Sequence, residues 1–381
     1  MTPLGAVGQP PAVPELAMAP RLLLGPGPDM VHPRVMAAMS APLMGHLDPE
    51  FLAVMDRTQQ LLRYAFQTRN QLTLAVPGTG SAAMEASVAA LVRPGDAVLV
   101  CVNGYFGARI AEMARRHGGD VTTLERPWGE AFDPQEVRDA LRAHPAQVVA
   151  IVHAETSTGL LQPLDGIAQV VHEADALLLV DAVTSLGGVP VRVDDLEIDA
   201  CYSCTQKCLG CPPGLGPVTL GPRAATRLAA RARPGESWSL DLELLQRYWG
   251  PDHTYHHTAP ISLHFALYEA LRMLAEEGLE PRWARHRRNA ELLWAGLEAM
   301  GLELHVPAEY RLPSVTTVRI PDGVDDASVR GRLLAEYGIE IGGGLGSLRG
   351  RVWRIGLMGH SSRAENVVLL LGALGRLLGR G

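Results

Sequence analysis

The chain has 381 residues, of which 47% are hydrophobic and 20% are charged; this composition permits a large core and excludes a disordered, collagen-like or disulfide-rich protein. The formal net charge of −7 argues against a general nucleic-acid binder, which would present a basic face. No apolar run reaches the ~18–20 residues that a membrane span needs, and the length fits two domains.

The first twenty residues are rich in Pro and small residues and contain no Lys or Arg. They predict an extended N-terminal arm over residues 1–20, and they lack the basic start of a secretion signal. The five cysteines, an odd number, are typical of reduced thiols. We therefore expect a cytoplasmic protein.

Short apolar runs alternate with helical stretches through the first two thirds of the chain. A helix is expected at 50–66, where apolar side chains recur at helical spacing. Strands are expected at 72–76, 97–102, 148–152, 177–180, 200–203 and 218–220, and helices at 81–92, 108–117 and 166–173. This alternation predicts an α/β fold with a mostly parallel sheet covered on both faces.

The pattern changes after residue 261. Two long amphipathic helices are expected at 261–277 and 281–300. Shorter strands and helices follow at 314–319, 327–337, 352–355 and 363–378. We place a domain boundary near Gly278, so that residues 21–277 form a large domain and residues 278–381 a smaller C-terminal domain.

One lysine, Lys207, stands among 33 arginines. A GC-rich codon bias explains most of the arginine excess, but it does not choose where the remaining lysine lies. Arginine stays charged in proteins, whereas a lysine amine loses its proton when burial or neighbouring groups lower its pKa, and it then acts as a nucleophile. As a sole lysine in a loop rich in Gly, Pro and Cys, Lys207 is therefore a candidate catalyst.

Pyridoxal 5′-phosphate (PLP) is the cofactor that we expect such a lysine to hold, and it requires an amine, an acidic partner for its pyridine nitrogen, an anion site for its phosphate and a flat group against its ring. Asp181 closes the strand at 177–180. An acid at the carboxyl end of a parallel strand points into the crevice where α/β proteins bind ligands, and its carboxylate can pair with a protonated pyridine nitrogen. The alternative is an Asp that caps a helix or lies in a loop.

The stretch Gly78-Thr79-Gly80-Ser81 follows a strand and opens a helix. The free backbone N–H groups and positive dipole end of a helix N-terminus form a ready phosphate site, and glycine allows close approach. A Rossmann dinucleotide site is the competing interpretation. It is disfavoured because no strand-borne acid follows about twenty residues later.

Four cysteines surround Lys207: Cys201, Cys204, Cys208 and Cys211. They could form a zinc cage, but three residues separate the two C-x₂-C pairs, whereas the usual separation is ~15–20 residues. Small buried side chains are the favoured interpretation. The pair His256-His257 has no evident third ligand, and we predict no metal site.

Arg354 lies within the strand expected at 352–355. A strand-borne arginine near the C-terminus suits a bidentate clamp on a substrate carboxylate. The alternative for any one of 33 arginines is a surface charge.

Longer stretches of the chain resemble the class V aminotransferases, PLP enzymes of fold type I, and within them the alanine–glyoxylate and serine–glyoxylate (serine–pyruvate) aminotransferases. The stretches run in the family's order from residue 22 to the end, and they include LLLGPGP (22–28), PGTGSAAMEA (77–86), VNGYFGAR (102–109), HAETSTGLLQPLDG (153–166), LLLVDAVTSLGG (177–188), YSCTQKCLGCPPGLGPV (202–218), YHHTAP (255–260) and RIGLMG (354–359). The resemblance implies a large domain with a mostly parallel seven-stranded sheet and a smaller C-terminal α/β domain.

The resemblance also implies roles toward PLP. Lys207 would form the Schiff base and shuttle a proton, and Asp181 would hold the pyridine nitrogen. Phe106 would stack on the ring, and Thr156 would form a hydrogen bond on the side of the ring that carries the hydroxyl group. The phosphate would be bound by Thr79, Gly80, Ser81 and Gln206. Phe106 stands where the family often has Trp or Tyr, and Ser81 stands where some relatives carry His.

Two further implications concern the partner subunit and the substrate. Tyr255 and Thr258 would reach the phosphate of the neighbouring subunit, so the active unit would be a homodimer. Arg354 would bind the α-carboxylate of the substrate. Gly27 would also bind the substrate.

The activity implied is a ping-pong transfer of the amino group of alanine or serine to glyoxylate or pyruvate. A lyase or desulfurase on the same fold is disfavoured, because a desulfurase needs a mobile cysteine in the C-terminal third and the last cysteine is Cys211. A non-catalytic scaffold would be expected to lose Lys207. Neither nucleic acid nor a membrane is an expected partner.

Overall fold

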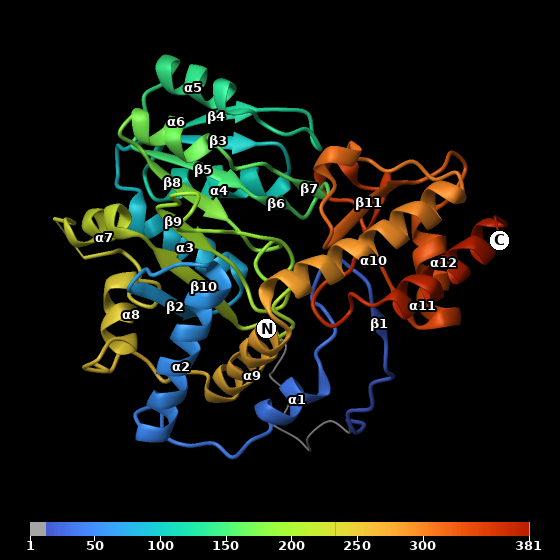
Figure 1. Ribbon diagram of the computed structural model, residues 1–381, viewed down its shortest axis with the longest axis horizontal. Helices are drawn as coiled ribbons and strands as arrows, with labels where there is room; N and C mark the ends of the chain where they lie inside the picture. The colour runs from blue at the N-terminus through green and yellow to red at the C-terminus, as the bar shows by residue number, and fades with distance from the viewer. Residues whose placement is uncertain (1–12, 233, 381) are drawn as a thin grey trace, which may run out of the picture.

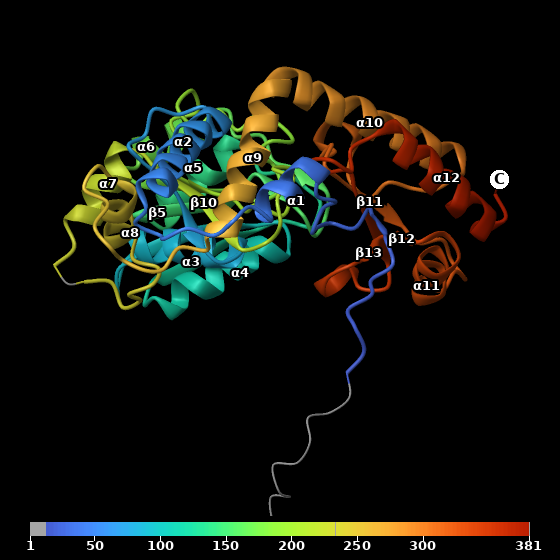
Figure 2. The same cartoon turned by 90° about the horizontal axis from the view of Figure 1, so that it is seen from below.

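The computed structural model describes residues 13–232 and 234–380. The first twelve residues of the predicted arm lie outside this range. Residues 13–20 are exposed and form neither helix nor strand, and Figure 2 shows this segment leading away from the body of the molecule. Among the described helices, none combines the length and apolar character needed to cross a membrane.

A seven-stranded sheet in the order β2-β10-β9-β8-β5-β3-β4 forms the centre of the molecule (Figure 1). Its strands are β2 (Leu72–Pro77), β3 (Ala97–Val102), β4 (Asp120–Glu125), β5 (Val148–Val152), β8 (Leu177–Asp181), β9 (Ala200–Tyr202) and β10 (Leu215–Leu220). All neighbouring pairs are parallel except those of β10, which is antiparallel to both β2 and β9. Every residue of β5 and β8 is buried, as expected where helices cover both faces of a sheet.

Helices cover both faces of this sheet (Figure 2), with α3 and α4 on one side and α2 and α6 on the other. The helices of this part of the chain are α1 (Pro33–Met39), α2 (Pro49–Phe66), α3 (Gly80–Leu91), α4 (Tyr105–Arg116), α5 (Pro134–Ala143), α6 (Ile167–Glu173), α7 (Pro222–Ala229), α8 (Leu242–Trp249) and α9 (Ile261–Glu277). The predicted α/β fold with a mostly parallel sheet is confirmed.

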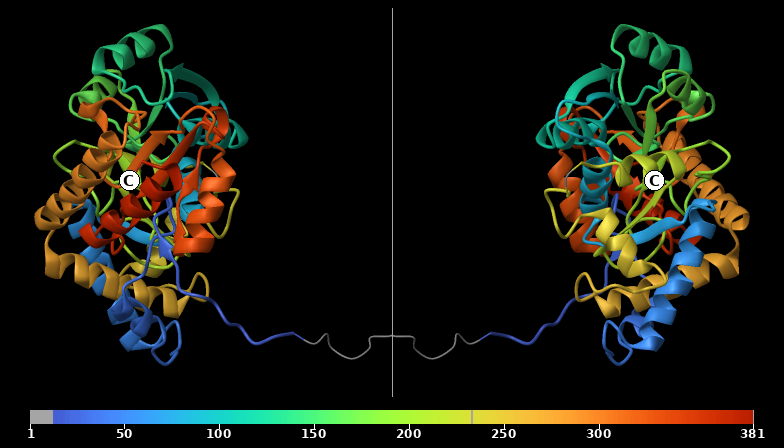
Figure 3. Two further views of the ribbon diagram at one scale, coloured as in Figure 1. Left: turned by 90° about the vertical axis from the view of Figure 1, so that its right-hand side faces the viewer. Right: turned by 90° about the vertical axis from the view of Figure 1, so that its left-hand side faces the viewer.

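The remaining elements gather at the end of the molecule opposite α7 and α8 (Figure 1), and they face the viewer in the left-hand view of Figure 3. A three-stranded sheet contains β11 (Val315–Arg319), β14 (Val352–Gly356) and β13 (Gly342–Gly343). The helices here are α10 (Leu279–Ala299), α11 (Asp326–Tyr337) and α12 (Ala364–Leu378), with short 3₁₀ turns at Ala308–Tyr310 and Gly346–Leu348. Two small ladders pair β1 (Leu22–Leu23) with β12 (Ile339–Glu340) and β6 (Ala154–Glu155) with β7 (Leu160–Leu161).

Buried hydrophobic side chains form two main clusters. One surrounds the seven-stranded sheet and extends to Leu279. The other lies between α10, α11, α12 and β14, and it also contains Leu24. The N-terminal segment thus packs with elements more than 250 residues away in sequence, while the domain boundary near Gly278 stays a prediction.

Several elements were not predicted, among them β4, α1, α5, α7 and α8. The start of α5 carries a capping box, in which Asp133 Oδ1 accepts from the Glu136 backbone N–H at 2.9 Å and Glu136 Oε2 accepts from the Asp133 backbone N–H at 2.9 Å. Pro134 occupies the first helical position. These residues form a local helix-start signal that was available in the sequence.

Candidate active site

Five chain segments bring most of the predicted cofactor-binding residues to one edge of the sheet. Asp181 ends β8, and β9 leads into the loop that carries Lys207. β2 leads into α3, β3 leads into α4, and β5 leads into the segment that contains Thr156. These strands run in one direction, so their carboxyl ends share the edge where α/β proteins bind ligands. In Figure 1 this edge faces β11 and the other C-terminal elements.

Lys207 is buried, with 8% of its surface exposed. It lies in a loop closed by two hydrogen bonds, from Gly210 N to Lys207 O at 2.9 Å and from Cys211 N to Thr205 O at 3.1 Å. Its Nζ donates to the carbonyl oxygen of Pro26. Burial lowers the pKa of Lys207, and the charge of Arg354 acts in the same direction. The neutral, nucleophilic form of the amine is therefore more populated here than on a surface lysine.

Asp181 is buried at the end of β8. Its Oδ1 accepts from Val183 N and its Oδ2 accepts from Tyr202 Oη, both at 2.8 Å. Burial raises the pKa of Asp181 to about 7, although these two hydrogen bonds oppose the shift. A cationic group beside the carboxylate would restore its charge. Tyr202, which orients it, was not predicted, but it ends the strand next to β8 at the position paired with Asp181.

The N-terminus of α3 forms a cradle for an anion. Its N-cap, Thr79, makes no side-chain capping bond, so the first N–H groups of the helix, including those of Gly80 and Ser81, lack an acceptor within the helix. The amide oxygen of Gln206 is buried without a hydrogen-bond partner, and Arg109 Nη1 donates to Ser81 Oγ at 3.2 Å. Unpartnered donors with a guanidinium close by suit a phosphate.

Glu155 holds the start of α4, which carries Phe106. Its Oε2 accepts from the backbone N–H groups of Phe106 at 3.1 Å and Gly107 at 3.3 Å, and its Oε1 accepts from Ser157 Oγ at 2.6 Å. A Cβ at Gly104 would lie 2.2 Å from Glu155 Cγ, so only glycine allows this approach. The Phe106 ring is partly buried. Sequence reasoning missed Glu155, although it lies in the stretch HAETSTG, next to Thr156.

Arg354 projects from β14 toward the same site. It is 7% exposed; Nε donates to Gly343 O at 2.7 Å, and Nη1 donates to Thr156 O at 3.3 Å. Burial lowers the pKa of Arg354 to about 10, and the charge of Glu155 opposes this. Thr156 Oγ1 bonds Thr184 Oγ1 at 2.5 Å. The contact between Arg354 and Thr156 joins the C-terminal part of the chain to the segment after β5.

Gly27 lies against the lysine amine. Its φ is +103°, and a Cβ at this position would lie 2.6 Å from Lys207 Nζ and 2.6 Å from Lys207 Cδ. Glycine is therefore needed for both its backbone conformation and its lack of a side chain. The predicted substrate-binding residue thus borders the reactive nitrogen.

Tyr255 and Thr258 are both exposed. The Tyr255 ring lies 5.2 Å from the His46 ring, centroid to centroid, and 58% of its surface is accessible. Their predicted contact with the cofactor of a partner subunit stays a prediction.

The cysteines around Lys207 are buried and unpaired. Burial raises the pKa of Cys204 to about 12 and that of Cys208 to about 11. Cys204 packs against Gly80 and Cys208 against Gly188. Within residues 13–232 and 234–380, no group of three or more His, Cys, Asp or Glu side chains is arranged to hold a metal ion.

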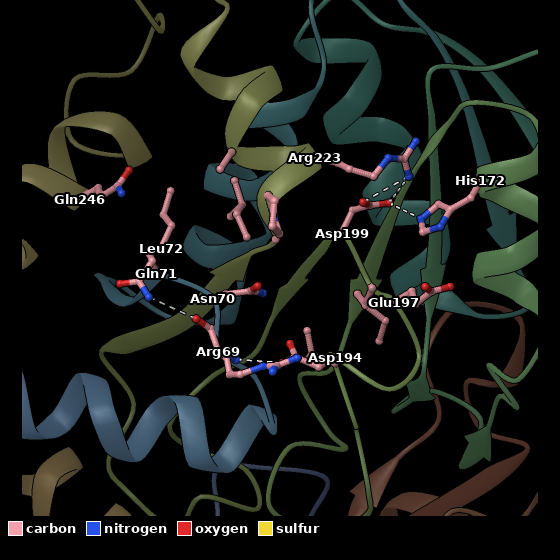
Figure 4. A pocket seen from close by; sticks show the side chains of 16 residues that line it. Arg69, Asn70, Gln71, Leu72, His172, Asp194, Glu197, Asp199, Arg223 and Gln246 are labelled. Atoms are coloured by element: carbon pink, nitrogen blue, oxygen red, sulfur yellow. Dashed lines mark hydrogen bonds and ion pairs between the residues drawn. The ribbon is translucent and has the colours of Figure 1, made fainter.

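A cavity of about 640 Å³ lies at the opposite edge of the sheet (Figure 4). Leu72 at the start of β2 and Asp199 just before β9 border it. Asp199 accepts from His172 Nε2 at 2.8 Å and Arg223 Nη1 at 3.1 Å, so these three side chains partner one another. None of the predicted site residues lines this cavity.

Comparison with known proteins agrees with this geometry. The family model for class-V aminotransferases matches residues 34–365, and the chain belongs to that family. Its sequence is 44% identical to alanine–glyoxylate aminotransferase of Oryctolagus cuniculus, covering 93% of this chain and 91% of that protein. It is 41% identical to (S)-ureidoglycine–glyoxylate transaminase of Bacillus subtilis, covering 96% of this chain and 92% of that protein. The crystal structure of alanine–glyoxylate aminotransferase from Nostoc sp. superposes with a TM-score of 0.95 at 55% identity, covering 96% and 97% of the two chains.

The protein is therefore a PLP-dependent aminotransferase with the fold type I architecture, as predicted. The residues present fit the cofactor. The uncapped α3 N-terminus suits its phosphate, and the buried Asp181 carboxylate suits its pyridine nitrogen. Because the relatives are aminotransferases, transamination is favoured over the lyase, desulfurase and scaffold alternatives.

Proposed function

We propose that this aminotransferase transfers the amino group of alanine or serine to glyoxylate or pyruvate by a ping-pong mechanism. Two similar proteins are named for a transfer to glyoxylate, from alanine in one and from ureidoglycine in the other. The similarity therefore supports a small 2-oxo acid as the acceptor.

One observation carries the proposal. Lys207, Asp181 and Arg354 supply a buried amine, a buried carboxylate and a buried guanidinium, and the charges of Asp181 and Arg354 both act on the Lys207 amine. They are the three groups needed to hold a carbonyl cofactor covalently, to keep its ring electron-poor and to bind an amino-acid carboxylate.

Bound PLP would supply an electron sink for the electrons released when the donor loses its α-proton. Lys207 Nζ would accept that proton and return it to the cofactor side, since burial favours its neutral form. Asp181 would keep a negative charge beside the pyridine nitrogen, oriented by Tyr202 and Val183.

Arg354 would bind the α-carboxylate of the donor and of the acceptor. Its Nε and one N–H of Nη1 are held by Gly343 O and Thr156 O. The remaining N–H groups are free to form the parallel pair that a carboxylate accepts. The contact of Gly27 with Lys207 supports a small substrate, because the backbone of residues 26–27 lies close to the amine.

The phosphate would be held by the N–H groups of Gly80 and Ser81, the Thr79 hydroxyl and the Gln206 side chain. The Gln206 amide can turn its NH₂ toward an anion, because its oxygen and nitrogen exchange places by a flip. Phe106 would lie against the ring, and Thr156 would bond the hydroxyl side of the ring.

We also propose a homodimer that works in the cytoplasm. The exposure of Tyr255 and Thr258 is consistent with groups that complete a neighbouring site, and unpaired cysteines are consistent with a reducing compartment.

The test is an absorbance titration of the purified holoprotein. Alanine or serine without an acceptor is expected to remove the band of the lysine-bound cofactor, and glyoxylate or pyruvate is expected to restore it. Lys207→Arg is expected to abolish turnover, because a guanidinium does not lose its proton. A band that no donor changes, or turnover that survives in Lys207→Arg, would contradict the proposal.

A further inference from the structure

Three charged side chains surround the junction of α9 and α10. Glu277 ends α9, and Arg282 and Arg285 lie in the first two turns of α10. Glu277 Oε2 accepts from Arg282 Nη1 at 2.8 Å, and Glu277 Oε1 accepts from Arg285 Nε at 2.6 Å. One carboxylate thus holds both guanidinium groups.

Arg282 extends from this junction to the lysine side of the active site. Its Nη2 donates to Cys208 O at 2.7 Å, and its Nε donates to Gly187 O at 3.0 Å. Cys208 is the residue after Lys207, and Gly187 belongs to the segment that follows Asp181. All three side-chain nitrogens of Arg282 are therefore used, and 6% of the residue is exposed.

Arg285 extends to the segment that follows Arg354. Its Nη1 donates to Gly359 O at 3.0 Å and to Ser362 O at 2.7 Å. His286 contributes a third bond there, because its Nε2 accepts from Gly359 N at 3.1 Å. These contacts hold the loop between β14 and α12, five residues beyond Arg354.

The Glu277 carboxylate is ionised in this arrangement. Burial would raise its pKa, but Arg285 and Arg282 outweigh burial and hold the pKa of Glu277 below its usual range. Charge-assisted hydrogen bonds in a half-buried site are stronger and more directional than surface ion pairs. Removing the carboxylate would leave the buried Arg282 guanidinium without its counter-ion.

We propose that Glu277, Arg282 and Arg285 form a bracket that sets the distance between the Lys207 amine and the Arg354 guanidinium. The three are positioning residues: Arg282 and Arg285 contact the backbone on either side of the site rather than the substrate, and Glu277 holds both arginines. An amino acid that is bound through both its amine and its carboxylate needs these two groups at a fixed separation. The inference rests on the proposed function, in which Arg354 binds the substrate carboxylate.

The test compares two small reagents that react with the bound cofactor. Aminooxyacetate carries a carboxylate and O-methylhydroxylamine does not, and both capture the cofactor's carbonyl carbon. The rate constant for aminooxyacetate is divided by that for O-methylhydroxylamine, and this quotient is divided by the same quotient for free PLP. The normalised ratio measures how much the protein favours capture by a reagent that carries a carboxylate. In Glu277→Gln this normalised ratio is expected to fall about tenfold, since small displacements of catalytic groups have effects of that order or larger. The O-methylhydroxylamine rate is expected to stay unchanged.

Glu336→Gln is the matched control, because Glu336 pairs with Arg332 at 2.6 Å on the exposed surface of α11. It should keep the wild-type ratio. If Glu277→Gln does not fold, Arg285→Gln replaces it; its side chain is 26% exposed, and the same fall is expected.

A purely structural ion-pair cluster would lower the melting temperature of Glu277→Gln and leave the ratio at the wild-type value, and that result overturns the bracket alone. A wild-type ratio equal to that of free PLP would contradict the role of Arg354. It would overturn the proposed function and the bracket together.

Discussion

Replacing Gly27 by alanine adds one methyl group beside the reactive amine. The new Cβ would lie 2.6 Å from Lys207 Nζ and 2.7 Å from Lys207 Cε. Ordinary contacts between such atoms are about 3.5–4.0 Å. The end of the lysine side chain must therefore move by about 1 Å.

The displacement and the backbone strain act on different properties. A catalytic group misplaced by about 1 Å loses about 100-fold in rate, so kcat/KM for alanine and glyoxylate should fall by that order. The φ of +103° at Gly27 lies in the region that L-residues avoid, at a cost of about 1–2 kcal/mol in the free energy of unfolding.

Gly95→Ala separates the two effects. Gly95 has a φ of +85°, and a Cβ there would have no atom within 4 Å. It should lose a similar free energy of unfolding and keep wild-type kcat/KM. Both variants are measured by denaturant unfolding and by a coupled assay of pyruvate formation.

A Gly27→Ala enzyme as active as Gly95→Ala would refute the reasoning. It would mean that Lys207 tolerates the displacement, and that the backbone of residues 26–27 does not restrict the amine.

Four further outcomes are expected. Asp181→Asn should lower kcat by about 100-fold or more, measured at saturating substrate, because a fixed charge at the ring is lost. Arg354→Gln should raise the KM for alanine about 10–100-fold, since charge-assisted bonds contribute about 1.5–3 kcal/mol. Asp29 is buried, and burial raises its pKa to about 7 from 3.8, so between these values the folded protein holds a proton that the unfolded protein has lost. The unfolding free energy of the wild type relative to Asp29→Asn should therefore fall by up to about 1.4 kcal/mol per pH unit from about pH 4 to pH 7. Equal slopes against pH in urea titrations of the two proteins would contradict this. Mixed and reassembled Lys207→Ala and Tyr255→Ala subunits should regain about a quarter of wild-type activity if Tyr255 completes the partner's site in a symmetric dimer, and no regain would contradict that dimer.

The elements of the sheet could be predicted because their signals are local. Strands at 97–102 and 148–152 and the helix at 261–277 have the bounds observed in β3, β5 and α9. Other ends differ by a few residues: α4 begins at Tyr105 rather than residue 108, because Glu155, distant in sequence, caps its first turn.

The helices that were missed are short: α1 has 7 residues, α5 has 10, and α7 and α8 have 8 each. The eight-residue helices α7 and α8 follow a β10 strand that the sequence placed only at 218–220, whereas it starts at Leu215. The antiparallel direction of β10 was not visible in its residues either. Strand direction depends on the connection that returns the chain to the sheet, and this is a property of the whole topology.

The candidate site divides in the same way. Lys207, Asp181 and the Gly78–Ser81 stretch could be found in sequence, because each lies at a recognisable place relative to one strand. Tyr202 and Glu155 could not be assigned in this way, because their roles depend on which strands and helix ends are neighbours.

By itself the sequence determined the reactive chemistry of this protein: a sole lysine in a loop, an acid at a strand end and a glycine-rich helix start, each a matter of residue type and local backbone. Tertiary structure alone decided how these groups are tuned and spaced. Burial shifts the pKa values of Lys207 and Asp181, and contacts across more than 70 residues, such as those from Arg282 to Cys208, hold the loops in place. The physical reason is that desolvation and distance depend on the surroundings of a group in three dimensions, which no local stretch of sequence specifies.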